Sequence, residues 1–223
     1  MIKRLEIKNF KAFEYADLEL SNFTLLAGKN SMGKTSVIQA IFAMLQNGNN
    51  PFRGEYMNIG NVSELINTIT GNGEIEFKMQ YENGGEIEEV TKKITKFSSS
   101  DSKECKEDIR VIYCSSERIG VKDTYRKYLE DQIIIGKNCE YVFPYLNVHY
   151  EDKIELEKDF IVDPESKLTF GGQVNYWLYK IMGYWVRAKE IEKTELIQVL
   201  YNDGKIKLEM SPKNVGTGVT YIA

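Results

Sequence analysis

The stretch Gly28-Lys29-Asn30-Ser31-Met32-Gly33-Lys34-Thr35 decides the fold. It fits the pattern G-x-x-x-x-G-K-[ST], the P-loop that binds phosphate groups. The apolar run at residues 23–27 before it has strand character, and residues 35–46 after it have the apolar spacing of a helix. Because strand, loop and helix in this order are the context that the motif requires, the sequence predicts a nucleotide-binding P-loop and not a plain Gly/Ser/Asn turn.

The chemistry of such a loop follows from its backbone. Glycines allow the chain to wrap around phosphates with successive N–H groups pointing inward, and the following helix presents its positive N-terminal end to the same place. Lys34 supplies a mobile cation for the β- and γ-phosphates, and the Thr35 hydroxyl is placed to ligate Mg²⁺. The predicted cofactors are therefore ATP and Mg²⁺. The residues predicted to bind the phosphates are Gly28, Asn30, Ser31, Gly33, Lys34, Thr35 and Ser36.

Composition narrows the class of protein. The chain has 223 residues, 42% of them hydrophobic and 28% charged, with a net charge of −4 and no long apolar run. These values predict a globular cytoplasmic protein without a membrane span or a signal peptide. Three widely spaced cysteines indicate reduced thiols, and the single His149 is expected to be structural. Because no dense basic stripe is present, contact with DNA would need a local patch or another chain.

The first half of the chain is predicted to be rich in β-structure. Residues 2–10 alternate between apolar and charged side chains, and residues 15–20 resemble a second strand, so that three strands precede the P-loop. A short helix is expected within residues 62–69. Residues 74–97 alternate on both sides of Asn83-Gly84-Gly85, which predicts a hairpin. Residues 98–103 are polar and predicted to form a loop.

The second half is predicted to be mixed. Residues 109–114 form a short apolar run typical of a buried strand, and the polar residues 115–120 that follow it could contact a ligand or form an exposed turn. Helices are predicted over residues 127–135 and, after a pair of glycines, 173–181, continuing irregularly past Gly183. Residues 195–210 alternate around Asn202-Asp203-Gly204, which predicts a second hairpin.

Several segments resemble the prokaryotic RecF/SMC/OLD-like AAA-type ATPases, which have ABC-ATPase-like heads. Residues 7–11 are similar to their "I-x-N-F-[KR]" segment, and residues 113–120 to a "Y-x-S-x-E-R-x-G" segment. Residues 173–178 and 214–219 also look like theirs. The resemblance implies an α/β P-loop NTPase of the ABC/SMC-head type, with a β-rich N-terminal lobe and a mixed sheet plus helical segments.

The resemblance also implies further site residues. Lys11, Glu117 and Arg118 would lie near the nucleotide, in the last two cases as part of a Q-loop-like segment. Asn214, Gly216 and Gly218 would form a signature-like segment that contacts, in trans, the ATP bound by an opposite head. Residues 169–173 are an alternative signature because they spell T-F-G-G-Q before a helix. The order of segments along the chain favours residues 214–219.

The chain departs from the family in one respect, since no clear Walker B strand ending in an acid can be found. Residues 196–203 are better explained as a hairpin. The apolar run within residues 160–163 is too short for a Walker B strand. The catalytic acid is therefore unknown. The sequence is interpreted as a single, incomplete ATPase-head domain over residues 1–223, with a P-loop lobe at 1–97 and a Q-loop-like and signature-like part at 98–223.

Two functions remain open at this point. The first is the ATP-binding part of a head that dimerises, with itself or with a C-terminal ATPase half, and couples hydrolysis to DNA processing or to a nuclease or toxin partner. The second is a nucleotide-gated interaction module that does not hydrolyse ATP itself. The lack of a clear Walker B acid suggests this alternative. A P-loop kinase or small GTPase is disfavoured because three strands precede the P-loop and no Asn-Lys-x-Asp motif is present.

Overall fold

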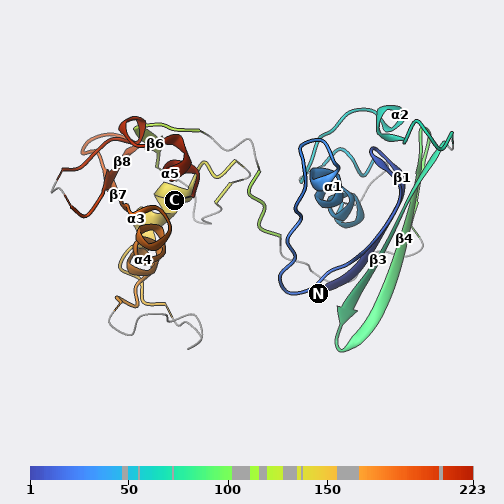
Figure 1. Cartoon of the computed structure of the whole chain (residues 1–223), viewed down its shortest axis with the longest axis horizontal. Helices are drawn as coiled ribbons and strands as arrows, with labels where there is room; N and C mark the ends of the chain where they lie inside the picture. The colour runs from blue at the N-terminus through green and yellow to red at the C-terminus, as the bar shows by residue number, and fades with distance from the viewer. Residues whose placement is uncertain are drawn as a thin grey trace. The chain divides into compact units, whose positions relative to one another are not determined.

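The computed structural model describes residues 1–46, 50–54, 56–71, 73–101, 111–115, 120–127, 135–136, 138–154, 166–205 and 208–222. The chain divides into two compact units, Met1–Val111 and Ile112–Ala223, drawn in Figure 1. Each unit is described by itself. Across the described ranges, no helix has both the length and the apolar character needed to cross a membrane.

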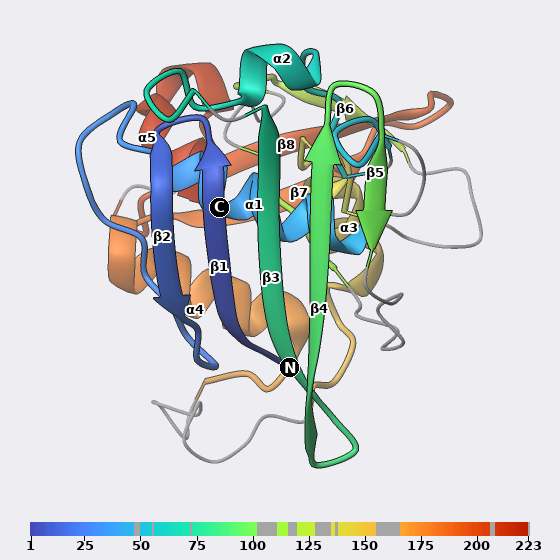
Figure 2. The same cartoon turned by 90° about the vertical axis from the view of Figure 1, so that its right-hand side faces the viewer.

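Unit 1 is built on one antiparallel sheet of five strands in the order β2-β1-β3-β4-β5 (Figure 2). Its strands are β1 (Ile2–Phe10), β2 (Phe13–Glu19), β3 (Glu74–Asn83), β4 (Glu86–Thr95) and β5 (Ser99–Asp101). The first two predicted N-terminal strands and the predicted hairpin are confirmed, and β1 lies between β2 and β3. The predicted mixed sheet is wrong, because every described strand pair in it is antiparallel.

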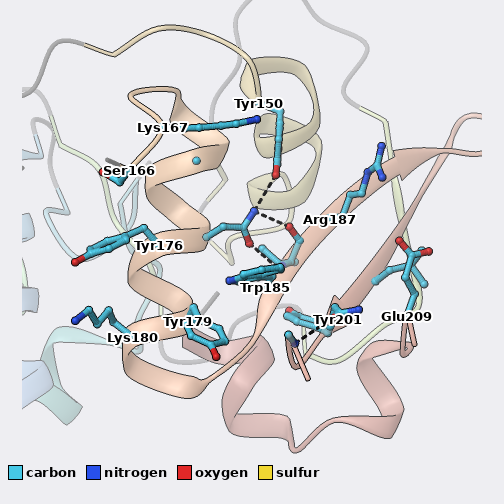
Figure 3. Close-up of a pocket in the computed structure, with 16 residues that line it drawn as sticks. Tyr150, Ser166, Lys167, Tyr176, Tyr179, Lys180, Trp185, Arg187, Tyr201 and Glu209 are labelled. Carbon is cyan, nitrogen blue, oxygen red and sulfur yellow. Dashed lines mark hydrogen bonds between the residues drawn. The ribbon is translucent and has the colours of Figure 1, made fainter. Parts of the chain in front are cut away.

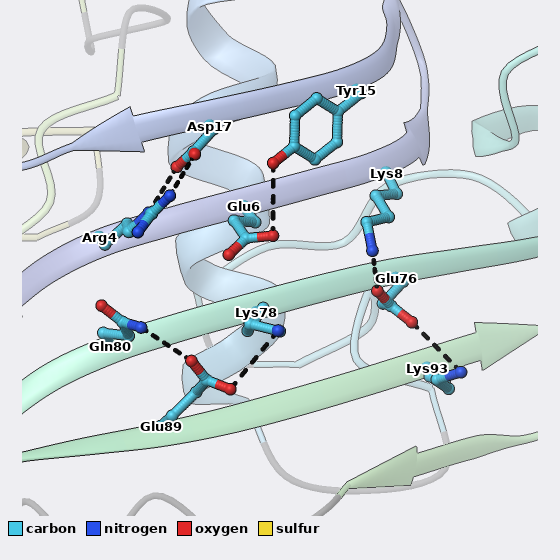
Figure 4. A network of polar contacts seen from close by, with 10 residues as sticks. All are labelled: Arg4, Glu6, Lys8, Tyr15, Asp17, Glu76, Lys78, Gln80, Glu89 and Lys93. Atoms are coloured by element: carbon cyan, nitrogen blue, oxygen red, sulfur yellow. Dashed lines mark hydrogen bonds and ion pairs between the residues drawn. The ribbon is translucent and has the colours of Figure 1, made fainter.

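Alternation along the strands separates the two faces of this sheet. Leu5 and Ile7 of β1 and Phe77 of β3 are fully buried on one face. The opposite face carries charged residues that pair across strands, as Figure 4 shows. Lys8 Nζ lies 2.6 Å from a Glu76 carboxylate oxygen, and the bond that it donates lowers the pKa of Glu76. One apolar face and one charged face are typical of an antiparallel sheet that is covered on a single side.

Helix α1 (Lys34–Leu45) covers the apolar face, as the two views in Figures 1 and 2 agree. Its end is fixed from the sheet by Lys92 of β4, whose side chain is only 1% exposed. Lys92 Nζ donates to the main-chain oxygens of Ala43 at 2.9 Å and Gln46 at 2.8 Å. A buried ammonium is tolerated here because it is bonded to carbonyl groups at the negative end of the helix. The helix that carries the P-loop lysine is therefore fixed at its far end.

Unit 2 contains a three-stranded antiparallel sheet in the order β6-β8-β7. Its elements are β6 (Thr124–Arg126), α3 (Val142–His149), α4 (Phe170–Met182), β7 (Trp185–Glu190), β8 (Leu196–Asn202), the 3-10 helix η2 (Pro212–Asn214) and α5 (Thr217–Ile222). The core of this unit gathers buried apolar residues from its three strands and from α3, α4 and α5, among them Tyr125, Leu178, Val186 and Val199. The unit thus has a hydrophobic core of its own.

Two predicted strands do not form. Residues 23–27 have no strand pairing with any described segment, and Phe23 and Leu25 are 81% and 76% exposed. The described part of the predicted strand at 109–114, residues 111–114, is also irregular, and Ile112 is exposed. An apolar run becomes a strand only where a neighbouring strand can accept its hydrogen bonds, and neither run has one among the described residues.

Other predictions need smaller corrections. The polar loop predicted at 98–103 includes β5, which pairs with β4, and the short helix α2 (Val62–Leu65) covers only part of residues 62–69. Helix α4 begins at Phe170, so Gly171 and Gly172 lie in its first turn and not before it. It ends at Gly183, which has a left-handed φ of 75°, and β7 follows directly.

The main partner of β8 is β7, not the segment after Asn202-Asp203-Gly204. That segment returns only as an isolated bridge between Tyr201 and Met210. The helix predicted over residues 127–135 falls almost wholly outside the described residues.

Candidate phosphate-binding site

The P-loop ends in a helix N-terminus that is open to an anion. Gly33 is the N-cap of α1 and supplies no side chain to the first N–H groups, and the first turn carries no acidic residue. The first amides of a helix have no partner within the helix, so they are free to donate to a bound group. With twelve residues, α1 is long enough to present a substantial positive end to a phosphate.

The curvature of the loop depends on backbone angles that glycine adopts readily. Gly33 has a φ of 90°, and Ser31 within the loop has a φ of 63°. A Cβ added at Gly33 would lie 2.6 Å from Phe13 Cζ, so the ring of Phe13 leaves no room for a side chain there. Phe13 begins β2, which means that the β-unit before the P-loop helps to shape the loop.

Among the residues that the structure describes, two lysines and no acid line the hollow at this helix end. The cavity measures about 450 Å³ and is lined by Lys11, Ala12, Asn30, Ser31, Gly33, Lys34, Thr35 and Ser36. Lys34 Nζ donates to the main-chain oxygens of Gly28 and Lys29, both at 2.7 Å. Lys11 Nζ donates to Gln39 Oε1 at 2.7 Å, and partial burial lowers its pKa. The arrangement favours an anionic ligand.

The structure brings most of the predicted site residues together. Six of the seven predicted phosphate-binding residues line the cavity, with the Thr35 side chain exposed and Ser36 buried. The seventh, Gly28, contacts Lys34 through its carbonyl oxygen. Lys11, which only the resemblance pointed to, lines the same cavity. Glu117 and Arg118 lie outside the described residues.

The cavity can hold phosphates but offers few metal ligands. Thr35 contributes a hydroxyl, and in the part of the chain that the structure describes no three His, Cys, Asp or Glu residues cluster to hold an ion. Residues 196–202 form β8 at the centre of an antiparallel sheet, and Asp203 Oδ1 accepts a bond from the Lys205 amide. These residues pair with β7, and the segment after Asn202-Asp203-Gly204 returns only as an isolated bridge, so the hairpin interpretation is confirmed only in part. Residues 160–163 lie outside the described residues.

The signature-like segment combines anchored valines with exposed glycines. Val215 and Val219 belong to the buried core of unit 2, whereas Asn214, Gly216 and Gly218 are exposed. A Cβ added at Gly216 or Gly218 would meet nothing within 4 Å, and neither residue has a positive φ. The packing of this unit therefore does not require glycine at either position.

The alternative signature at 169–173 is a packed helix start. The Thr169 side chain caps α4 by accepting from the Gly172 amide at 3.2 Å. A Cβ at Gly171 would lie 2.3 Å from the ring of Tyr150, so glycine is needed there for packing. Gln173 is buried and donates to Ser166 and to the main chain of Lys167. These residues are used internally, which weighs against a contact with another molecule.

Sequence reasoning missed two residues that support the site. Phe13 packs against Gly33, and Gln39 holds the Lys11 ammonium. Only Gln39 has a sequence signal, since it lies about one helical turn beyond Thr35 and so on the same face of α1. The contact of Phe13 joins residues distant in sequence and has no local pattern.

Comparison with known proteins gives two findings. A model of the family described as "AAA ATPase domain" matches residues 1–173 of the chain. The chain is also similar to the OLD nuclease of Thermus scotoductus (strain ATCC 700910 / SA-01), with 44% identity over 45 residues. Those residues are 20% of this chain and 8% of the nuclease, so the similarity extends over only a small part of that protein.

Proposed function

The chain belongs to the AAA ATPase domain family, and on that premise we propose that its P-loop binds MgATP as one half of a composite ATPase site. The family match confirms the predicted resemblance to AAA-type ATPases of the RecF, SMC and OLD kind. The observation that carries the proposal is the cavity at the N-terminus of α1, whose described lining includes two lysines and no acid. Magnesium would bridge the β- and γ-phosphates and neutralise developing charge.

Each residue of the cavity has a part in this proposal. The first amides of α1 and the loop N–H groups bind the phosphates, and Lys34 exchanges its two main-chain acceptors for phosphate oxygens. Lys11 adds a second cation near the phosphates, and Thr35 ligates the metal through its hydroxyl. The water-activating acid comes from outside the described residues, from a second head or from a C-terminal ATPase half.

Two features support completion of the site by another segment or chain. The exposed glycines Gly216 and Gly218 are not required by packing, so a contact made through their backbone explains them better. The apolar segment at residues 23–27 is exposed beside the P-loop, and an added strand would bury Phe23 and Leu25. We propose a head dimer, or pairing with an ATPase half, that covers both.

The process coupled to this site is proposed from the comparison alone. Because one similar protein is an OLD nuclease, we propose DNA processing or a nuclease or toxin effector as the partner activity. The second candidate function is a nucleotide-gated interaction module that does not hydrolyse ATP, which the lack of a described acid beside Thr35 favours.

Phosphate release separates these two candidates. The purified chain is incubated with MgATP at several protein concentrations, alongside Lys34→Ala as the control for contaminating ATPase. A composite site made by two copies predicts release that rises faster than linearly with protein concentration and is lost in the variant. Nucleotide binding without release favours the gated module, and release that Lys34→Ala leaves unchanged contradicts a role for the P-loop.

A further inference from the structure

Unit 2 contains a pocket that the P-loop chemistry does not use. It measures about 860 Å³ and lies between α4, strands β7 and β8, and the segments at Tyr150 and Ser166–Lys167. Figure 3 shows Tyr176, Tyr179 and Lys180 projecting from α4, with Arg187 and Glu209 on the side of the strands. All of its described lining residues belong to unit 2, so nucleotide binding at the P-loop does not account for it.

Aromatic rings dominate the lining. Tyr150, Tyr176, Tyr179, Trp185 and Tyr201 all contribute. Trp185 is 49% exposed, and its ring lies 5.5 Å from that of Tyr179, tilted by 48°. Large rings left half exposed side by side are costly in water unless a ligand covers them. Their flat faces suit another flat ring, because stacking removes apolar area from water and adds dispersion attraction between the rings.

The position of the rings is fixed by one side chain. Asn175 of α4 donates to Tyr150 Oη and to the Val186 main-chain oxygen, both at 3.0 Å, and accepts from the Val186 amide at 2.6 Å. These bonds tie α4 to the start of β7, next to Trp185. The pocket is therefore preformed, which lowers the entropic cost of binding a ligand.

The charge around the pocket is positive although the chain as a whole is acidic. Lys167, Lys180 and Arg187 line it, and none of the three has an ion pair with a described residue. The one acidic residue of the described lining, Glu209, accepts from Lys189 Nζ through both of its carboxylate oxygens at 3.0 Å. Three cations without an ion pair to a described residue, next to stacking surfaces, fit an anionic aromatic ligand.

We propose that this pocket binds a nucleobase together with its adjoining phosphate, presented by single-stranded nucleic acid or by a free nucleotide. The base stacks on Trp185 and Tyr179, and the phosphate lies against one of the lining cations, Lys180 on the α4 side or Arg187 on the side of the strands. Aromatic platforms flanked by cations are how proteins hold single strands without reading their sequence, since every base has a flat face. The proposal does not depend on the P-loop, because the two cavities have no described lining residue in common.

Binding is measured with the full chain and a 5′-fluorescein-labelled 15-mer of thymidylate at low salt, without ATP or Mg²⁺. The chain has two tryptophans, so stacking on Trp185 should also quench tryptophan fluorescence, and Trp177→Phe leaves Trp185 as the single reporter. We expect anisotropy to show binding that weakens steeply with salt. Unlabelled thymidine monophosphate, added as competitor, separates the two sources, since equal potency per nucleotide indicates a free nucleotide and much weaker competition indicates a strand.

Variants locate the binding. Trp185→Ala and the pair Lys180→Gln with Arg187→Gln should each raise Kd by about tenfold or more. The matched controls are Trp177→Ala, an exposed ring on α4 outside the pocket, and Arg126→Gln, an exposed cation on β6. Lys34→Ala should bind the strand like the wild type.

Three results overturn the proposal. They are the absence of binding to both probes, equal Kd in the pocket variants and their controls, and loss of binding in Lys34→Ala. Because Lys180 and Arg187 are exposed, their substitution keeps the fold and leaves the test valid even if Trp185→Ala unfolds.

Discussion

At the scale of single residues, Gly33 joins the fold to the site. It needs glycine for two reasons, a φ of 90° and the ring of Phe13 where a Cβ would lie. We expect Gly33→Ala to lower the free energy of unfolding by about 2–4 kcal/mol and to weaken nucleotide binding, because the N-terminus of α1 must shift.

Gly84→Ala is the matched control for Gly33→Ala. Gly84 also has a positive φ, 59°, but a Cβ there would meet nothing within 4 Å. Backbone strain alone should cost about 1–2 kcal/mol and leave nucleotide binding intact. Urea unfolding of both variants checks this, and equal losses would contradict the role of Phe13.

Tyr201 gives unit 2 a dependence on alkaline pH. Burial raises the pKa of its phenol to about 12 from a usual 10.0. The folded state favours the neutral phenol. The resulting contribution of Tyr201 to the free energy of unfolding is therefore complete below pH 10 and is lost as the pH rises toward 12. We expect roughly 1–3 kcal/mol of the stability of wild type to disappear over this range.

Tyr201→Phe tests that dependence because it cannot ionise. Its stability should fall less than that of wild type between pH 10 and 12, measured by denaturant unfolding at fixed pH. Parallel curves for the two proteins would show that another group governs the alkaline loss.

At the scale of secondary structure, the placement of α1 depends on Lys92. Replacing it by methionine keeps most of the buried volume but leaves the carbonyls of Ala43 and Gln46 without the ammonium donor. We expect Lys92→Met to cost about 1–3 kcal/mol in thermal or urea unfolding. Lys93→Met on the exposed face, where Lys93 pairs with Glu76 at 3.2 Å, should cost clearly less, because solvent screens an exposed ion pair. Equal costs would contradict the capping role.

The elements also show how far sequence reasoning reaches. Strand β1, helix α1 and the β3–β4 hairpin follow from alternation, apolar spacing and the Asn83-Gly84-Gly85 turn, because each signal is local. Residues 23–27 have an equally apolar pattern but form no strand, since pairing depends on a neighbour that composition cannot supply. Strand β7 was not predicted, because the helix was expected to continue past Gly183, whereas Gly183 ends α4 and the strand follows directly.

The residues of the candidate site that belong to a local motif were predictable from the sequence, and those that depend on distant contacts were not. The motif alone named Lys34 and Thr35, and the family resemblance added Lys11. The contact between Phe13 and Gly33 and the aromatic pocket of unit 2 arise where distant segments meet, so neither has a signature in one stretch of sequence.

At the scale of the whole molecule, each unit has its own core. We expect two calorimetric unfolding transitions. Lys92→Met should lower the midpoint of one of them, and Leu178→Ala, which empties part of the unit 2 core at a cost of about 2–5 kcal/mol, should lower the other. A single transition that moves with both substitutions would contradict independent cores.

We expect the intact chain to bind MgATP through its P-loop. Isothermal titration calorimetry of MgATP into the wild-type chain and into Lys34→Ala tests it most directly. We expect saturable binding by the wild type and a loss of affinity of at least about tenfold in the variant, because the lysine is proposed to contact the phosphates directly. Equal binding by the two proteins, or no binding by either, would contradict it.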